Sequence, residues 1–468
     1  MSEEFELADL GDKRLTARAC LIADGVSRAP LGTLPQKAEN SAALEGAYRF
    51  FANDGFSPEA VLASHFARTA ERAERAKYVL VAHDTTAFNF GGAAGRAGMG
   101  PLGERDGATG FFAHYSVCFS RTGEPLGAIG LFAWARVTTR KPSREQRISQ
   151  SDPDRESLRW HDAIDGAGEL LHSVDTVIHV LDREGDSMEL LADMREHHRR
   201  FVVRVAHDRR LDCSRKATDV EKLYDSLSVA PFFQMRRVPL KRRGCSQRPV
   251  QERVFGQMPT RDAYLTIRAG TFVVSPGNGA SYHLPDRLEL NFVEVIELDP
   301  PEGMVAVHWR LVTTEPIETL QQVSDIVDIY RARWQIEEFF KAVKTGCQFK
   351  TLQLETATAL IVALTIYTAV AWQVLLMRWL DRNEPEAPAT RALSSTELGT
   401  LRAVCKMKGK PLTNAPTTHE VMMAIARLGG HIKNNGPPGW LVLGRGFTKL
   451  QAMEQGYLAA FALNEESG

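Results

Sequence analysis

Several features that define other classes of protein are missing from this chain of 468 residues. Its six cysteines are widely scattered and include no C-x-x-C pair, so neither a zinc site nor a disulfide framework is indicated. The first residues, MSEEFELADLGDKR, are acidic and contain no apolar stretch of the kind that a secretory signal requires. Internal repeats, low-complexity tracts, a Ser-His-Asp motif and a glycine-rich phosphate loop are also missing. Together these absences favour a reducing cytoplasm as the location.

An overall excess of positive charge is missing too, because the formal net charge is −1. A nucleic-acid-binding protein need not be basic overall, provided that its cations gather where the phosphates lie. Between residues 199 and 253 cations far outnumber acids: Arg209, Arg210, Arg215, Lys216, Arg236, Arg237, Lys241, Arg242, Arg243 and Arg248. This cluster predicts contact with DNA, although a solvated loop can have the same composition.

One apolar segment could be mistaken for a membrane span, since Ala357 to Met377 contains no charged residue over 21 positions. Its threonines, its glutamine and its many alanines lower the hydrophobicity of the segment. We therefore predict a long helix in the core of the protein and no membrane partner.

The segment IYRARWQIEEFFKAVKTG combines helical periodicity with closely spaced polar residues. When each residue advances a helix by about 100°, five polar residues fall within one arc of roughly 80°. They are Tyr330, Arg333, Glu337, Lys341 and Lys344. The opposite side is apolar and should pack on a core. Glu338 lies at the margin of the arc, so Glu337 is predicted to be the working acid, although surface ion pairs also have this spacing.

Two aspartates are predicted at the ends of buried strands. YVLVAHDTT is apolar until it approaches Asp84, and TVIHVLDREGD reaches Asp182 in the same way. Open α/β folds place their chemistry at the carboxyl ends of strands. Two such aspartates and the helical Glu337 form a candidate oxygen-ligand site for Mg²⁺ or Mn²⁺. Glu184 and Asp186 are predicted to support this site rather than to bind the metal.

These residues resemble the DDE transposases of the bacterial insertion sequence four family, the family of the transposon five transposase. The family signature is Tyr, two residues, Arg, three residues, Glu, six residues and Lys. Tyr330, Arg333, Glu337 and Lys344 match it without gaps. Further matches are HDTT around Asp84, DRE from Asp182, FVVR ending at Arg204, EGAYRF at 45–50 and AIARLGG at 424–430. The resemblance extends along nearly the full length of the chain.

The resemblance implies an α/β fold with a ribonuclease H-like catalytic core and a β-rich insertion, flanked by N-terminal and C-terminal helical domains. The stretches YVLVA, HYSVCFS, AIGLFAWARV, TVIHVL and FVVRVA read as the strands of such a core. We predict a DNA-end-binding domain at 1–72, a catalytic domain at 73–380 with its insertion at about 205–315, and a dimerisation domain at 381–468. For the last of these, a plain helical cap is the alternative.

The activity that the resemblance implies is cut-and-paste transposition. Such an enzyme nicks the transposon end, forms a hairpin, reopens it and joins the 3′ end to target DNA. Asp84, Asp182 and Glu337 would be the catalytic residues and would hold two Mg²⁺ ions per active site, which Mn²⁺ could replace. The implied partners are double-stranded transposon ends, target DNA and a second copy of the chain in a homodimeric synaptic complex. The implied location is the bacterial cytoplasm, in association with the nucleoid.

Eight residues are predicted to contact DNA. They are Tyr330, Arg333, Lys341, Lys344, Arg204, Trp309, Arg14 and Arg18. Lysines and arginines would hold phosphates, for which the guanidinium group offers a bidentate contact. By the resemblance, Trp309 would stack on a base removed from the helix, while Arg204, Tyr330 and Arg333 would hold the adjacent phosphate. Read without the family, Trp309 lies in an apolar strand and also fits a core position.

Other functions remain open at this point. A metal-dependent nuclease or resolvase on the same fold would cut DNA without strand transfer. A catalytically silent DNA-binding descendant of a transposase would keep the fold alone. Glycoside hydrolysis by paired carboxylates is a third possibility, against which the arginine-rich stretch argues.

Overall fold

The computed structural model describes residues 1–91, 96–103, 107–136, 157–212, 220–240, 261–277, 283–302, 306–432 and 437–466. The chain forms a mixed α/β fold that divides into two compact units. The first unit comprises Met1–Val79, Asp84–Asp175 and Gln335–Gly468, and the second comprises Leu80–His83 and Thr176–Trp334. Strand β1 (Tyr78–Asn89) contributes residues to both units.

The N-terminal part of the first unit is helical, as predicted. After a 3₁₀ turn at Ser2–Glu4 it contains α1 (Lys13–Arg28), α2 (Leu34–Lys37), α3 (Ser41–Phe51) and α4 (Pro58–Ala76). Three of these helices begin where a side chain accepts a free backbone N–H group: Asp12 caps α1, Asn40 caps α3 and Ser57 caps α4. The capping residues are short and polar and come directly before apolar periodic stretches. These helices can therefore be predicted from the sequence.

A small sheet in the first unit carries one of the predicted acids. It consists of residues Asp84–Asn89 of β1, with β3 (Thr109–Ser120), β2 (Gly100–Pro101) and β4 (Pro125–Trp134). Strands β3 and β4 form an antiparallel pair. Helices α4 and α6 (Leu158–Leu170) pack on this pair.

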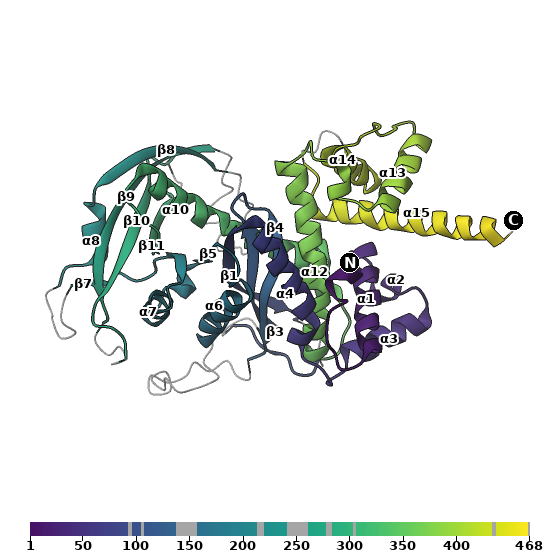
Figure 1. Ribbon diagram of the computed structural model, residues 1–468, viewed down its shortest axis with the longest axis horizontal. Coiled ribbons are helices and arrows are strands. Elements are labelled where there is room, and N and C mark those ends of the chain that lie inside the picture. Colours follow the sequence, from purple (N-terminus) through teal and green to yellow (C-terminus); the bar gives the residue numbers. More distant parts are fainter. Residues whose placement is uncertain are drawn as a thin grey trace. The chain divides into compact units, whose positions relative to one another are not determined.

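Helix α12 (Ala357–Asn383) is the core helix of the first unit. It packs on α1, α3, α4 and β4 (Figure 1). By length and composition alone it could cross a membrane, but 83% of its most apolar window is buried inside the protein. Thr365 and Thr368 are buried within it and donate to backbone carbonyls of the preceding turn. The predicted core helix is confirmed.

The remaining elements of the first unit, before and after the core helix, are helical. These are α11 (Trp334–Lys341), a π-helical turn at Ala342–Gly346, 3₁₀ turns at Phe349–Thr351 and Ala389–Arg391, α13 (Ser395–Met407), α14 (Thr418–Leu428) and α15 (Trp440–Glu466). The apolar side of α11 is buried as predicted, because Ile336 and Phe339 are fully enclosed.

The second unit is built on a sheet in the order β1-β5-β6-β11-β10-β9-β7, with β8 paired to β9. Its parallel pair is β5 (Thr176–Leu181) and β6 (Arg200–Arg204). The antiparallel strands are β7 (Arg210–Leu211), β8 (Phe232–Leu240), β9 (Arg261–Ser275), β10 (Leu288–Leu298) and β11 (His308–Thr313). Helices α7 (Met188–Glu196), α8 (Leu223–Ser228) and α10 (Leu320–Ala332) pack on this sheet (Figure 1). The β-rich stretch predicted before Glu337 is present.

Two local predictions are wrong. The sequence predicts Asp84 at a strand end, but β1 continues to Asn89 because the β-branched Thr85 and Thr86 and the aromatic Phe88 favour an extended backbone. The sequence also predicts one helix from Tyr330 to Lys344. In the structure α10 ends at Ala332, α11 covers Trp334–Lys341, and Lys344 lies in the π-helical turn.

Candidate active site

Asp84 lies in the middle of β1 and belongs to the first unit. Its half-buried carboxylate accepts a hydrogen bond from the backbone N–H of Thr85 at 2.8 Å. Side chains alternate between the two faces of a strand, so Asp84 and Thr86 share one face while Thr85 lies on the other. The Asp84 carboxylate therefore projects from one face of β1, on the same side as Thr86, and not from a strand end.

Lys344 is the residue on which the charges of both predicted acids of the first unit act. Its Nζ donates to Oγ1 of Thr86 at 2.5 Å. Burial and, to a smaller extent, the charge of Lys350 lower the pKa of Lys344, while the negative charges of Glu337 and Asp84 oppose the shift, so that the net pKa is about 8. Asp84 and Glu337 therefore both lie near enough to Lys344 for their charges to act on its ammonium group.

The π-helical turn gives Lys344 this position. The backbone N–H of Cys347 bonds to the carbonyl of Ala342, five residues earlier, at 2.8 Å. A π-helical turn contains one more residue than an α-helical bond would enclose, so the constant step of about 100° does not hold beyond Lys341. Turns of this kind are frequent at functional sites.

The adjacent acids Glu337 and Glu338 have different neighbours. Glu338 accepts a hydrogen bond from Nζ of Lys341 at 2.7 Å. Burial alone would raise the pKa of Glu338, but this ion pair and the charges of two arginines outweigh it and lower the pKa. Lys341 therefore pairs with Glu338 within α11, whereas Glu337 is the acid whose charge acts on Lys344.

Asp182 lies at the end of β5 in the second unit, as predicted. Strands β5 and β6 are parallel and Leu181 is paired with Val203, so Asp182 and Arg204 are neighbours at one edge of the sheet. Asp182 is half-buried, and its Oδ1 accepts from the backbone N–H of Glu184 at 2.8 Å, which starts a short 3₁₀ turn.

Trp309 and Tyr330 are in ring contact within the second unit. Their centroids are 5.5 Å apart and their planes meet at 66°, an edge-to-face arrangement. Tyr330 is only 6% exposed, so it packs on its neighbours instead of projecting from a polar arc. Trp309 is half-buried rather than enclosed in a core.

Two predicted arginines lie near Trp309 and Tyr330 in the chain or the sheet. Arg204 donates to the carbonyl of His308, the residue before Trp309, at 3.4 Å, and Arg333 is the C-terminal capping residue of α10.

The predicted site residues therefore fall into two sets. The first unit holds Asp84, Glu337, Lys341, Lys344, Arg14 and Arg18, and the second holds Asp182, Arg204, Trp309, Tyr330 and Arg333. Among the residues that the structure describes, no group of three or more His, Cys, Asp or Glu side chains is arranged to hold a metal ion. Asp84 and Glu337 are the two predicted ligands that belong to one unit.

Two protein-family models match the chain. The transposase DNA-binding family matches residues 1–56, and the transposase DDE domain matches residues 162–372. The protein is a DDE-type transposase. The DDE match contains Asp182, Glu337 and Lys344, whereas Asp84 lies outside both matched ranges of the transposase.

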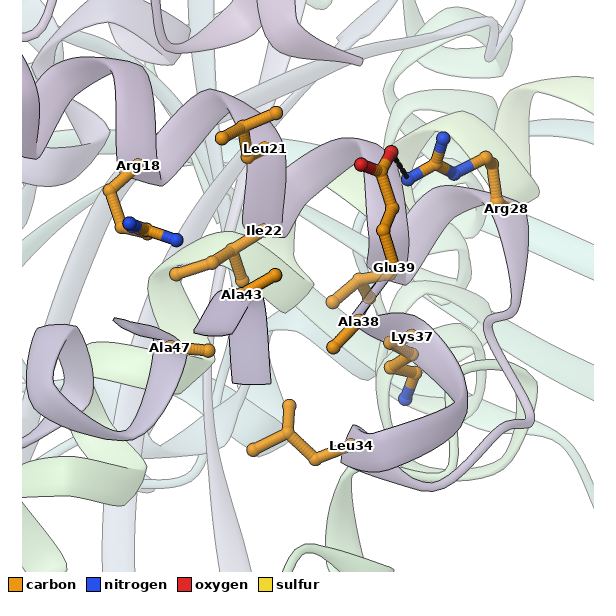
Figure 2. A pocket seen from close by; sticks show the side chains of 11 residues that line it. Arg18, Leu21, Ile22, Arg28, Leu34, Lys37, Ala38, Glu39, Ala43 and Ala47 are labelled. Atoms are coloured by element: carbon orange, nitrogen blue, oxygen red, sulfur yellow. Dashed lines mark hydrogen bonds and ion pairs between the residues drawn. The ribbon is translucent and has the colours of Figure 1, made fainter. Parts of the chain in front are cut away.

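Arg14 and Arg18 lie in the part of the transposase that matches the DNA-binding family. The Arg14 side chain is 92% exposed and pairs with the aspartate that caps α1. Arg18 is half-buried, and its guanidinium lies so close over Gly46 that a Cβ there would approach it to 2.5 Å. Figure 2 shows Arg18 on one side of a pocket lined by residues of α1 to α3, with the Arg28–Glu39 ion pair (3.0 Å) on the other. Of the two arginines, Arg14 is the more accessible.

The arginine-rich segment of the transposase is partly neutralised where the structure describes it. Three members form ion pairs with acids of the second unit: Arg209 with Asp186, Arg236 with Asp328, and Arg237 with Asp262. Six members lie outside the described residues: Arg215, Lys216, Lys241, Arg242, Arg243 and Arg248. The carboxylate partners of these arginines compete with phosphates for them, most strongly at the buried Arg209.

Two further residues of the transposase shape the site. Thr86, whose hydroxyl contacts Lys344, stands in the HDTT motif, and that motif was the available signal for it. Asp186 is buried and accepts from the backbone N–H of His207 at 3.0 Å and from Arg209 at 2.9 Å. It thereby fixes the chain that follows β6 and Arg204, consistent with a supporting role.

Proposed function

We propose that this DDE-type transposase moves DNA by cut-and-paste transposition. It binds the terminal repeats of its element, cleaves the ends through a hairpin intermediate and joins the 3′ ends to target DNA. The observation that carries the proposal is that the charges of Asp84 and Glu337 both act on the ammonium group of Lys344. With Asp182 they make up the three acids that the resemblance to the insertion sequence four family implies.

The strand arrangement supports a ribonuclease H-like catalytic core. In the first unit the order is β4-β3-β1, with β3 and β4 antiparallel, and in the second it is β1-β5-β6, with β5 and β6 parallel. Asp84 is carried by β1, the strand that both orders share. We assign end binding to residues 1–72, catalysis to 73–380 with an insertion at about 205–315, and dimerisation to 381–468.

The chemistry of the donor set fits divalent magnesium, with manganese as a substitute. Carboxylate oxygens are hard ligands of the kind that these ions prefer, and Asp84, Asp182 and Glu337 would hold two of them. When bound, the two ions activate the attacking oxygen and stabilise the leaving oxygen of an in-line displacement.

The chain's own side chains would hold the substrate. Lys344 is protonated at neutral pH, since its pKa is about 8, and can neutralise a phosphate beside the acids. Arg333 offers a bidentate contact to phosphate. The half-buried Trp309, held by the edge of Tyr330, offers a face on which an extruded base can stack. Lys341 can contact DNA only by leaving Glu338.

The proposed assembly is a homodimer that holds two transposon ends in a synaptic complex and acts in the bacterial cytoplasm on nucleoid DNA. The DNA-binding match supports DNA as the partner. The assembly itself is carried over from the family that the chain resembles.

A cleavage and strand-transfer assay on DNA with the element's terminal repeats, in Mg²⁺, tests the proposal. Glu337→Gln should abolish hairpin and joined products while end binding persists, and the neighbouring Glu338→Gln, whose partner is Lys341, should retain most activity. Equal defects in both variants would contradict the assignment of Glu337. Nicking without hairpins or joining would indicate a nuclease, and binding without cleavage in Mg²⁺ or Mn²⁺ would indicate a silent descendant.

A further inference from the structure

The hairpin of β3 and β4 carries three aromatic rings in one stack. Trp134 lies between the other two: its centroid is 5.5 Å from that of Phe112 and 5.3 Å from that of Phe132, with 24° between the planes in each case. The strand register places Phe112 directly opposite Trp134, and Phe132 is two residues away on the same face. The three rings therefore form one continuous stack on one face of the hairpin.

Two arginines lie over this stack. The guanidinium carbon of Arg136 is 4.2 Å from the Phe112 centroid, and that of Arg159 is 5.3 Å from the Trp134 centroid. The backbone of Arg136 is held against Gly100, where a Cβ would approach the Arg136 carbonyl oxygen to 2.0 Å. We call Phe112, Phe132, Trp134, Arg136 and Arg159 the aromatic platform.

The aromatic platform differs from the packed aromatic residues of the same unit. Phe88 and Phe111, which stack on the other face of the sheet, are fully buried. Phe132 is 52% exposed, and the other four members of the platform are half-buried. Cross-strand aromatic pairs stabilise a hairpin on their own. Phe132 therefore leaves about half of its surface accessible to a ligand, at the end of a ring stack that two arginines contact.

Arg159 connects the aromatic platform to the strand that carries Asp84. Its Nε donates to Oγ1 of Thr85 at 3.3 Å, and Thr85 is the residue after Asp84. The Thr85 hydroxyl is also hydrogen-bonded to the His114 ring. Burial and the charge of Arg159 lower the pKa of His114 to about 3. His114 is therefore neutral at physiological pH, and the arginines supply the charge on this side of β1.

We propose that the aromatic platform binds unpaired bases of a single DNA strand. Flat, sequence-tolerant stacking on aromatic rings and contacts from arginine are the means by which proteins hold single-stranded DNA. Arg136 and Arg159 match the charge of the phosphates that flank such bases. The inference goes beyond the proposed cut-and-paste reaction, because it assigns a DNA contact to residues that the proposed reaction does not use, and its test requires no catalysis.

Binding of fluorescent oligothymidylate to the full-length transposase, followed by anisotropy at several salt concentrations, tests the proposal. Phe132→Ala should weaken binding by about 5- to 150-fold, the range for loss of one stacked base. Arg136→Gln should reduce the salt slope by about 0.7, the value for one phosphate contact to a single strand. The matched control is Phe232→Ala, a phenylalanine of the second unit with 53% exposure, which should bind as the unsubstituted protein does.

A second readout locates the contact. Single-stranded DNA with 5-iododeoxyuridine should crosslink under light to peptides that contain Phe132 or Trp134.

Unchanged binding in both Phe132→Ala and Arg136→Gln would overturn the proposal, as would an equal loss of binding in Phe232→Ala. A lower melting temperature without a change in affinity would show that the stack is structural only. Equal loss of duplex and single-stranded binding would show a general DNA contact instead. Failure of hairpin formation or joining would affect the cut-and-paste proposal alone.

Discussion

Nζ of Lys37 lies 2.6 Å from the hydroxyl of Tyr367, and both residues are buried in the first unit. Lys37 belongs to the region that matches the DNA-binding family, and Tyr367 belongs to core helix α12. The centroids of the Tyr367 and Phe349 rings are 5.3 Å apart, and those of the Phe349 and Phe88 rings are 5.1 Å apart. Nζ of Lys344 lies 5.1 Å from the Phe88 ring. A continuous run of side chains thus connects the DNA-binding region to Lys344.

Lys37→Met should alter the pH dependence of stability. Burial lowers the pKa of Lys37 to about 8 from its ordinary 10.5, so the unfolded chain binds the proton more tightly than the folded one. The cost of burying the charge is fully present below about pH 8 and disappears as the pH rises toward 10.5. The unsubstituted protein should therefore gain about 2 kcal/mol relative to Lys37→Met between pH 7 and pH 10. Denaturant unfolding of both proteins at each pH measures this difference.

Lys410→Met is the control for that experiment, because Lys410 is exposed. Its stability relative to the unsubstituted protein should not change with pH over the same interval. A constant difference for Lys37→Met would show that Lys37 titrates near its ordinary pKa.

Glu4→Gln should destabilise the first unit by about 3 to 5 kcal/mol at pH 7, because it breaks a buried charge cluster. Glu4 accepts from His65 at 2.5 Å and from Arg72 at 2.8 Å. Burial would raise the pKa of Glu4, but these partners outweigh it and lower the pKa from 4.5 to about 2. The stabilisation is present above pH 4.5 and is lost as the pH falls toward 2, so the difference from the unsubstituted protein should shrink in acid.

Denaturant unfolding between pH 3 and pH 7 measures the effect of Glu4→Gln. The exposed neighbour Glu3 provides the control, and Glu3→Gln should change stability by less than about 0.5 kcal/mol. A deficit in Glu4→Gln that persists unchanged at pH 3 would contradict the assignment of charge to this cluster.

Lys344→Met should reduce the rate of end cleavage by about 10²- to 10³-fold, the loss found when one charge-stabilising donor is removed from an active site. Thr86→Val removes only the hydroxyl that Lys344 contacts and should cost about 2- to 12-fold. Single-turnover cleavage at saturating DNA measures both rates, and a gel-shift assay measures end binding. Cleavage at the normal rate in Lys344→Met would remove this residue from the proposed site.

Trp309→Ala should allow the first nick but block hairpin formation, because the extruded base would lose its stacking surface. Tyr330→Phe keeps the ring that contacts Trp309 and removes only the hydroxyl, so it should form hairpins more readily than Trp309→Ala. Denaturing gels separate nicked from hairpin ends. Hairpins at the normal rate in Trp309→Ala would assign this residue to packing alone.

The predicted elements that match the structure are those with strong local signals. The N-terminal helices follow capping residues, and the core helix follows an uncharged apolar stretch. Asp182 is found at a strand end because a turn follows β5 at once. Asp84 does not lie at a strand end, because Thr85, Thr86 and Phe88 after it favour an extended backbone and continue the strand.

The geometry around Lys344 could not be predicted from periodicity. A π-helical turn depends on backbone hydrogen bonds over five residues, such as the one from Cys347 to Ala342, and no residue type in the sequence requires them. The arginine cluster illustrates a second limit, because the acids that pair with Arg209 and Arg236 lie 23 and 92 positions away in the chain. The predicted three-domain organisation stays a prediction.

Core helix α12 has a consequence for how the protein is made. The elements that cover it from the N-terminal side, α1, α3, α4 and β4, leave the ribosome before it does, and α14 leaves afterwards. The most apolar segment of the chain therefore meets a partly formed binding surface as it is synthesised. A chain started after residue 76 would release the same segment without α1, α3 and α4 to receive it. Such a truncation should therefore yield aggregates or chaperone-bound chains rather than a smaller active enzyme.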